Sequence, residues 1–292
     1  MQNVLPHVIN GRHSAIFLGT ILSSFGCEST EESQILEPTV NLTTFAEARQ
    51  RGAILQTLQF GRIGKLHNQG LGEVYGQFTI FDINLTKFED QLVDYTASSS
   101  VSRDSLGLTA SDYTTMLDAF GHGDNMFPLL EIGEQATILR TYGISASDRK
   151  GLEYIIKVIR KPVSTPDEIY QNTVEIDEYL ARVHPHSTYL QQTFDIYKAS
   201  VQYWTSNLDS WLQLQVVGDS YVPLKAGGCN SWSWFWDVVN VMGERDFVSG
   251  SFGVAWGFFV GGPGGAGAVG VASALYGSGA SGLWEVIKCT GQ

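Results

Sequence analysis

The sequence contains little charge and few of the residues that usually carry redox or metal chemistry. Only 16% of its 292 residues are charged, and it holds three cysteines and six histidines. Three cysteines are too few for a disulfide-rich scaffold, and no Cys-x-x-Cys pair is present to bind a structural zinc ion. Basic residues are scarce too, 18 against 30 acidic ones, which gives a net charge of -12. A chain of this charge is poorly suited to neutralising phosphates, so nucleic acid is not an expected partner.

The motifs of nucleotide-binding and hydrolytic enzymes are missing as well. No phosphate-binding glycine loop with its lysine occurs in the sequence. Gly218-Asp219-Ser220 is similar to the start of the GDS esterase motif. Those enzymes supply their histidine later in the chain, whereas the last histidine here is His186. We therefore interpret residues 218–220 as a turn, and we expect neither catalysis nor a cofactor.

Two histidine-containing segments offer candidate metal ligands. The first is His184-Pro185-His186 with Asp177 or Glu178, and the second is His122 with Asp124. Neither group has a defined third ligand, and both lie at predicted helix ends, where such residues are ordinary in loops. We therefore predict no metal site.

The amino terminus carries an apolar run typical of an export signal. Residues 15–25, AIFLGTILSSF, follow Arg12, end at Gly26-Cys27 and precede an acidic stretch at residues 28–32. The run is shorter than the ~20 residues of a membrane-spanning helix and has the length of a signal-peptide core. The segment resembles the precursors of exported bacterial lipoproteins of the Bacteroidetes type, in which the cysteine after the signal peptide is lipidated.

That resemblance implies a signal peptide over residues 1–26, a lipid on Cys27, and a place in the cell envelope, at the outer membrane or the cell surface. The alternative is a buried apolar segment with a free Cys27. If Cys27 carries lipid, Cys229 and Cys289 remain as an even pair for a disulfide. That bridge would close a loop of about sixty residues and stabilise the fold by roughly 4 kcal/mol in the chain-entropy model. Two reduced core thiols are the alternative.

Helical periodicity dominates the middle of the chain. After a polar tether at residues 27–44, apolar residues in the range 45–215 recur at i, i+3 and i+7, with little of the alternation that marks strands. We expect an all-α domain, built as an antiparallel helical bundle. His67 within this domain is interpreted as a hydrogen-bonded histidine at a helix-packing boundary. Helices are predicted around residues 65–78, 85–95, 113–120, 152–159 and 165–183.

Two helices have especially clear signals. Thr165-Pro166-Asp167-Glu168 combines a capping residue, a proline at the first helical position and a glutamate that can return a hydrogen bond to the cap. A second helix is predicted over residues 187–214, because apolar residues there step by four and three alternately, as in a heptad pattern. Those seven residues are Leu190, Phe194, Tyr197, Val201, Trp204, Leu208 and Trp211.

The connector at residues 216–246 contains Cys229 and the tryptophans Trp232, Trp234 and Trp236. These tryptophans, with Trp256 and Trp284, suit an aromatic belt at a membrane surface. A buried aromatic core around Cys229 is the alternative, and it is the one we favour for an acidic protein already anchored elsewhere.

The last segment, residues 247–292, is rich in glycine, and residues 247–284 carry no charged side chain. Small residues recur every four positions, a spacing that allows close approach of another helix. Pro263 is expected to divide the segment into two helices of a hairpin. The segment resembles the glycine-rich tails of double-glycine bacteriocins and of uncharacterised exported Bacteroidetes proteins. The residues predicted for helix packing or membrane contact are Gly253, Gly257, Gly261, Gly265, Gly270 and Ala274.

These observations lead to two functional hypotheses. The first is an envelope-anchored lipoprotein with a structural or binding role, whose partners are membrane lipid through Cys27 and either envelope proteins or further copies of itself. The second is a membrane-active or bacteriocin-like protein that acts through the carboxyl-terminal hairpin.

Overall fold

The computed structural model describes residues 42–78, 80–82, 85–112, 114–115, 139–213, 215–217 and 231–290. Helices account for nearly all of this part, which confirms the predicted all-α class. Several predictions fall outside the described residues and stay predictions. They concern the signal peptide at residues 1–26, Cys27, His122 with Asp124, most of the helix at 113–120, the turn at residues 218–220, and Cys229.

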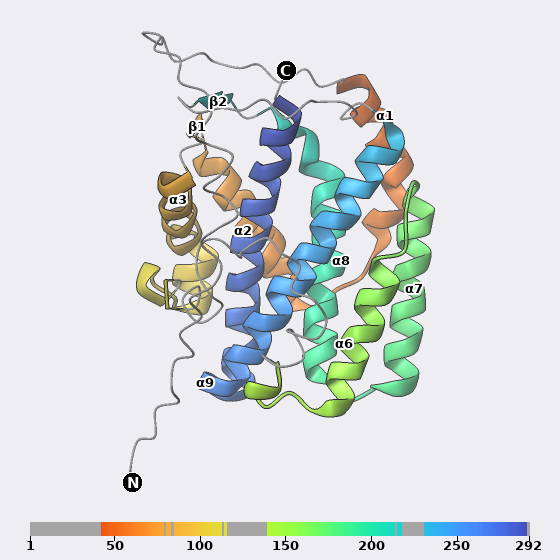
Figure 1. The fold of residues 1–292 in the computed structure, drawn as a ribbon, viewed down its shortest axis with the longest axis vertical. Helices are drawn as coiled ribbons and strands as arrows, with labels where there is room; N and C mark the ends of the chain where they lie inside the picture. Colours follow the sequence, from red (N-terminus) through yellow and green to blue (C-terminus); the bar gives the residue numbers. More distant parts are fainter. Residues whose placement is uncertain are drawn as a thin grey trace, which may run out of the picture. The chain divides into compact units, whose positions relative to one another are not determined.

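The first elements lie within residues 42–106. Helix α1 (Leu42–Arg51) continues into the 3-10 helix η1 (Gly52–Thr57), so the last three residues of the predicted tether are helical. Figure 1 shows the order of the elements, which continues with helix α2 (Arg62–Gln77), strand β1 (Ile80–Asp82), helix α3 (Leu85–Ser98) and the π-helix η2 (Val101–Leu106).

The later elements include the three longest helices described. Helix α6 (Ala146–Ile159) and helix α7 (Pro166–Val183) pack against each other. Helix α8 (Thr188–Leu212) leads to strand β2 (Gln215–Val217). Helix α9 (Trp232–Thr290) begins inside the predicted connector, so the Trp232–Asp246 part of that connector is helical.

Local sequence signals account for two of these helix starts. At α7, the Thr165 hydroxyl accepts a hydrogen bond from the Glu168 amide at 3.3 Å, and the Glu168 carboxylate accepts one from the Thr165 amide at 3.0 Å, which confirms the capping box. Ser187 caps α8 by accepting a hydrogen bond from the Leu190 amide at 3.2 Å.

Helix α8 is the centre of the core. Its seven predicted apolar residues all have 0 or 1% of their surface exposed. Ala199, on the opposite side of the helix, and Ser200 are fully buried as well. Because fully burying a large apolar side chain stabilises a fold by about 1.5–3 kcal/mol, this helix supplies a large part of the driving force for folding. It packs mainly on α9 and α2.

A short parallel strand pair lies beside the helices. Ile80, Phe81 and Asp82 of β1 pair with residues 215–217 of β2. The sequence pattern gave no indication of this pairing. Two strands of three residues stabilise little by themselves, so the pair depends on the helices around it.

Helix α9 folds back on itself although its helical backbone runs from Trp232 to Thr290. The Ser273 hydroxyl donates a hydrogen bond to the Ser249 carbonyl oxygen at 2.7 Å, which a straight helix would not allow. The helix continues through Pro263, so the predicted break is wrong. Neighbouring glycines allow the helical backbone to bend there. The predicted division into two helices at Pro263 is therefore not observed. No helix in the described ranges combines the length and hydropathy needed to cross a membrane.

Candidate functional site

The small residues of α9 bring two stretches of that helix into close backbone contact. A Cβ atom added to Gly253 would lie 2.5 Å from the carbonyl oxygen of Val269 and 3.0 Å from Cα of Gly270. A Cβ atom added to Gly250 would lie 3.5 Å from Cβ of Ala274. These distances leave no room for a larger side chain at Gly253, because the obstacle is backbone that cannot rotate away.

The surroundings of the other predicted packing residues are described for only some of them. Gly257 and Ala274 are buried, and Gly270 lies against Val254. Gly261 and Gly265 belong to α9, but their surroundings are not described, and the same holds for the Cys289 side chain. The structure therefore brings Gly253 and Gly270 together, places Ala274 against Gly250, and does not test the predicted disulfide.

Close approach through glycine also occurs in α2, outside the predicted small-residue repeat. A Cβ atom added to Gly64 of α2 would lie 2.8 Å from the carbonyl oxygen of Asp195 and 2.9 Å from Cβ of Ala199. Gly70 of α2 meets the Leu275 side chain, with an added Cβ atom 2.5 Å away. The signal was available, since Gly64 and Gly70 interrupt a helical pattern where glycine is otherwise unfavourable by ~1 kcal/mol relative to alanine.

A fully buried polar cluster lies where α2, α8 and α9 meet. Nε2 of His67 is 3.4 Å from Oδ2 of Asp246 and 3.2 Å from Oγ of Ser278. The Ser200 hydroxyl donates a hydrogen bond of 2.5 Å to the same Asp246 oxygen. His67 and Asp246 each have 0% of their surface exposed. The cluster thus ties together four stretches of chain that are far apart in sequence.

Both ring nitrogens of His67 have polar neighbours inside the core. Nδ1 of His67 faces the Asn68 side-chain oxygen at 3.1 Å, while Nε2 faces oxygens of Asp246 and Ser278. The contacts of His67 with Asp246 and Ser278 are a positioning element, because a buried polar group that loses its partner is costly. Their complete burial leaves no approach for a substrate.

His184 is also packed inside the protein. It is 7% exposed, and its Nε2 lies 3.1 Å from the Tyr179 hydroxyl. An added Cβ atom at Gly151 of α6 would lie 3.0 Å from that same nitrogen. Within the described part of the chain, no three His, Cys, Asp or Glu side chains gather as a potential metal site. His184 therefore joins α6 to the end of α7.

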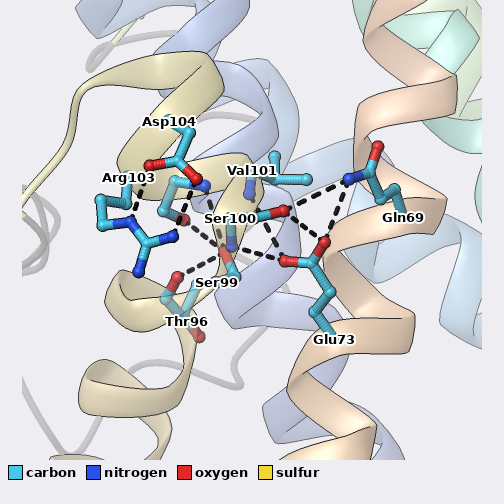
Figure 2. A network of polar contacts seen from close by, with 9 residues as sticks. Gln69, Glu73, Thr96, Ser99, Ser100, Val101, Arg103 and Asp104 are labelled. Atoms are coloured by element: carbon cyan, nitrogen blue, oxygen red, sulfur yellow. Dashed lines mark hydrogen bonds and ion pairs between the residues drawn. The ribbon is translucent and has the colours of Figure 1, made fainter.

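A second polar network lies nearer the surface and connects α2 to the segment after α3. Figure 2 shows the Glu73 carboxylate of α2 pointing at the chain around Ser100. Both the amide and the hydroxyl of Ser100 donate hydrogen bonds of 2.5 Å to this carboxylate, and the Val101 amide donates one of 3.4 Å. Gln69 adds another at 3.0 Å. Glu73 therefore caps the start of η2 from a different helix.

Those hydrogen bonds set the charge state of Glu73. Partial burial raises the pKa of its carboxyl group, but the hydrogen bonds from Ser100, Gln69 and the Val101 amide outweigh burial and hold the pKa below its ordinary value of 4.5. The carboxylate is consequently ionised at neutral pH. This site could not be found from the sequence, because nothing in the pattern around Glu73 shows which distant amide groups it meets.

Tryptophans of the predicted connector contribute to the core. Trp236 is 1% exposed, and Gly52 of η1 packs so closely that an added Cβ atom would lie 2.6 Å from its ring. Trp232 is partly exposed, with the Arg51 guanidinium 4.3 Å from its ring centroid. This arrangement agrees with a buried aromatic core for Trp236.

Comparison with known proteins finds no match, whether among protein-family models, curated proteins or solved structures.

Proposed function

We propose that the chain is an exported, lipid-anchored protein of the cell envelope whose helical body has a structural or binding role without catalysis. One observation carries the proposal, namely the order of an apolar run at residues 15–25, the dipeptide Gly26-Cys27 and an acidic stretch. The anchor would be a lipid on Cys27, at the outer membrane or the cell surface. Further partners would be envelope proteins or other copies of the chain.

The structure of the helical body supports a role without catalysis. Of the three described histidines, His67 and His184 are buried against partners within the helix packing, whereas His186 is exposed in the loop between α7 and α8. The close backbone contacts at Gly64 and Gly253 make the body tightly packed. A tightly packed body favours the presentation of a fixed surface to a partner.

Lipid attachment is testable on the full-length chain expressed in a bacterium with a lipoprotein pathway. Cells are grown with radiolabelled palmitate, and the purified protein is weighed intact with and without reductant. We expect label, and a mature mass that begins at a diacylated Cys27. Cys27→Ala should abolish the label and Cys229→Ala should retain it. An unprocessed, unlabelled wild-type chain would contradict the proposal.

The second candidate function is action on membranes through α9, and one observation favours it. Residues 247–284 have no charged side chain, yet in this fold α9 packs on α2, α3 and α8. A bundle of this kind can store an apolar segment that would enter a bilayer after release. Entry would require α9 to leave those contacts.

The two candidates differ in what a bulky residue does at Gly270, which lies against Val254. If α9 is structural, Gly270→Leu lowers the denaturation midpoint and leaves localisation intact, while Gly72→Leu, in open space on α2, has little effect. If α9 acts on membranes, Gly270→Leu folds normally but loses dye release from phosphatidylethanolamine–phosphatidylglycerol vesicles. Normal folding combined with unchanged dye release would argue against both assignments of Gly270.

A further inference from the structure

Helices α6 and α7 lie side by side as an antiparallel pair (Figure 1). The order of their contacts shows the direction, because residues further along α6 meet residues earlier in α7. Gly151 packs on His184, just after α7, and the rings of Tyr154 and Tyr179 stack with their centroids 3.9 Å apart. The solvent-exposed sides of the two helices therefore lie next to each other.

The exposed charges of this helix pair are divided by sign. On α6 and the two residues after it, four exposed charged side chains are basic and one is acidic, namely Lys150, Lys157, Arg160, Lys161 and Glu153. On α7 the balance is reversed, with four acidic side chains and one basic one, namely Asp167, Glu168, Asp177, Glu178 and Arg182. A positive surface therefore adjoins a negative one, although the chain as a whole is acidic.

Some of these charges have no opposite charge beside them in the chain. In the described ranges, Lys150, Lys157 and Glu178 take part in no ion pair. By contrast, Lys161 is bound to Glu175 across the helix pair at 2.5 Å. Lys150 and Lys157 are seven residues apart, so they lie on the same face of α6. Both signs of charge are therefore available to a partner on this surface.

The division of charge favours a partner with the same two charges in reverse order, because a partner of one sign would be repelled by one of the helices. A second copy of the chain offers that order when a two-fold axis lies in the interface, parallel to the helices. This axis sets α6 of each copy over α7 of the other. A two-fold axis across the helices would instead set α6 over α6, where like charges repel.

We propose that α6 and α7 form a self-association surface, through which two copies of the chain pair about the parallel two-fold axis, with Lys157 of each copy facing Glu178 of the other. The inference rests on the structural or binding role proposed above and is independent of a lipid on Cys27. Among the described residues, Val183 is the one large apolar side chain that is exposed, at 48%. The pairing therefore depends on charge and weakens as salt is added.

Sedimentation velocity of the full chain carrying Cys27→Ala, which has no cysteine for a lipid at that position, measures the pairing. We expect a monomer–dimer equilibrium at about 50 mM salt that shifts to monomer at about 1 M salt, where the screening length is about 3 Å. Adding Lys157→Glu or Glu178→Lys should raise the dimer dissociation constant about tenfold or more. An equal mixture of those two variants should form dimers again, because each copy then supplies the charge that the other requires.

The matched control is Lys65→Glu, at an exposed position of α2 outside this surface, which should pair as the parent chain does. The salt series on the parent chain keeps the test valid if a charge variant fails to fold. The proposal is overturned if the parent is monomeric at low salt, or if the mixture of folded variants stays monomeric. It is also overturned if Glu178→Lys leaves the chain monomeric and strengthens its binding to phosphatidylglycerol vesicles, since that result identifies anionic lipid as the partner.

Discussion

At the scale of single residues, glycines differ sharply in what surrounds them. Gly72 of α2 has no atom within 4 Å of an added Cβ position, whereas Gly253 has backbone from Val269 in that space. Glycine therefore only weakens the helix at position 72, whereas at position 253 it is required because a larger residue would not fit. Only the neighbouring chain distinguishes the two.

We expect Gly253→Ala to lower the free energy of unfolding by about 1–3 kcal/mol, because the new methyl group meets a carbonyl oxygen that cannot move without shifting the backbone. Gly72→Ala should raise the free energy of unfolding by about 0.5–1 kcal/mol, since alanine favours a helix and the site is open. Urea denaturation of both variants measures the difference. Equal midpoints would show that the close contact at Gly253 is relaxed in solution.

A second residue-scale expectation concerns the buried pair of His67 and Asp246. Asp246→Asn alters a buried acceptor that meets both the Ser200 hydroxyl and Nε2 of His67, so we expect a loss of about 1–3 kcal/mol in the free energy of unfolding. Asp237→Asn, at an exposed position of the same helix, should change it by less than about 0.5 kcal/mol. Similar urea midpoints for the two variants would mean that the pair contributes no net stability.

At the scale of elements, the helices differ in how their ends are satisfied. Helix α7 has a complete capping box within its own sequence, from Thr165 to Glu168. Helix η2 has no side-chain cap of its own, and its first amides are met by Glu73 of α2. A helix with a local cap depends on its own sequence, whereas a helix capped from elsewhere depends on the packing that brings the cap to it.

Thr165→Ala should lower the free energy of unfolding by about 1 kcal/mol, because the Glu168 amide loses its acceptor. Thr188→Ala is the matched control, since that threonine is exposed at the start of α8 and Ser187 already serves as the cap. Thermal melts followed by circular dichroism compare the two variants. A smaller effect for Thr165→Ala than for its control would contradict the assigned role of the capping box.

At the scale of the whole molecule, the response to alkali is set by buried tyrosines. Burial raises the pKa of the Tyr189, Tyr197 and Tyr203 hydroxyl groups above the ordinary value of 10.0. A raised pKa means that the folded state favours the neutral hydroxyl group over the ionised one. That stability is fully present below pH 10 and is lost as the pH rises toward the folded values.

We therefore expect the urea midpoint to stay nearly constant between about pH 7 and pH 9 and to fall steeply above about pH 10. The absorbance of ionised tyrosine near 295 nm should rise cooperatively with unfolding in that range. Tyr197→Phe would shift the fall to higher pH, although the same variant also loses the 3.0 Å hydrogen bond to Asn240. Gradual tyrosine ionisation without unfolding would show that these hydroxyl groups are accessible in the folded state.

Local patterns in the sequence were sufficient to predict the all-α class, the capping box at Thr165, and a long helix close to the observed α8 with its seven buried residues. These features depend on residues within a few turns of one another. The pairing of β1 with β2, the contact of Glu73 with Ser100 and the meeting of His67 with Asp246 were decided only by tertiary structure. Their partners lie 27 or more residues apart, so no local periodicity or spacing connects them. Glycine shows the same division, because the sequence places Gly253 in a four-residue repeat, while only the folded chain shows that backbone occupies the space beside it.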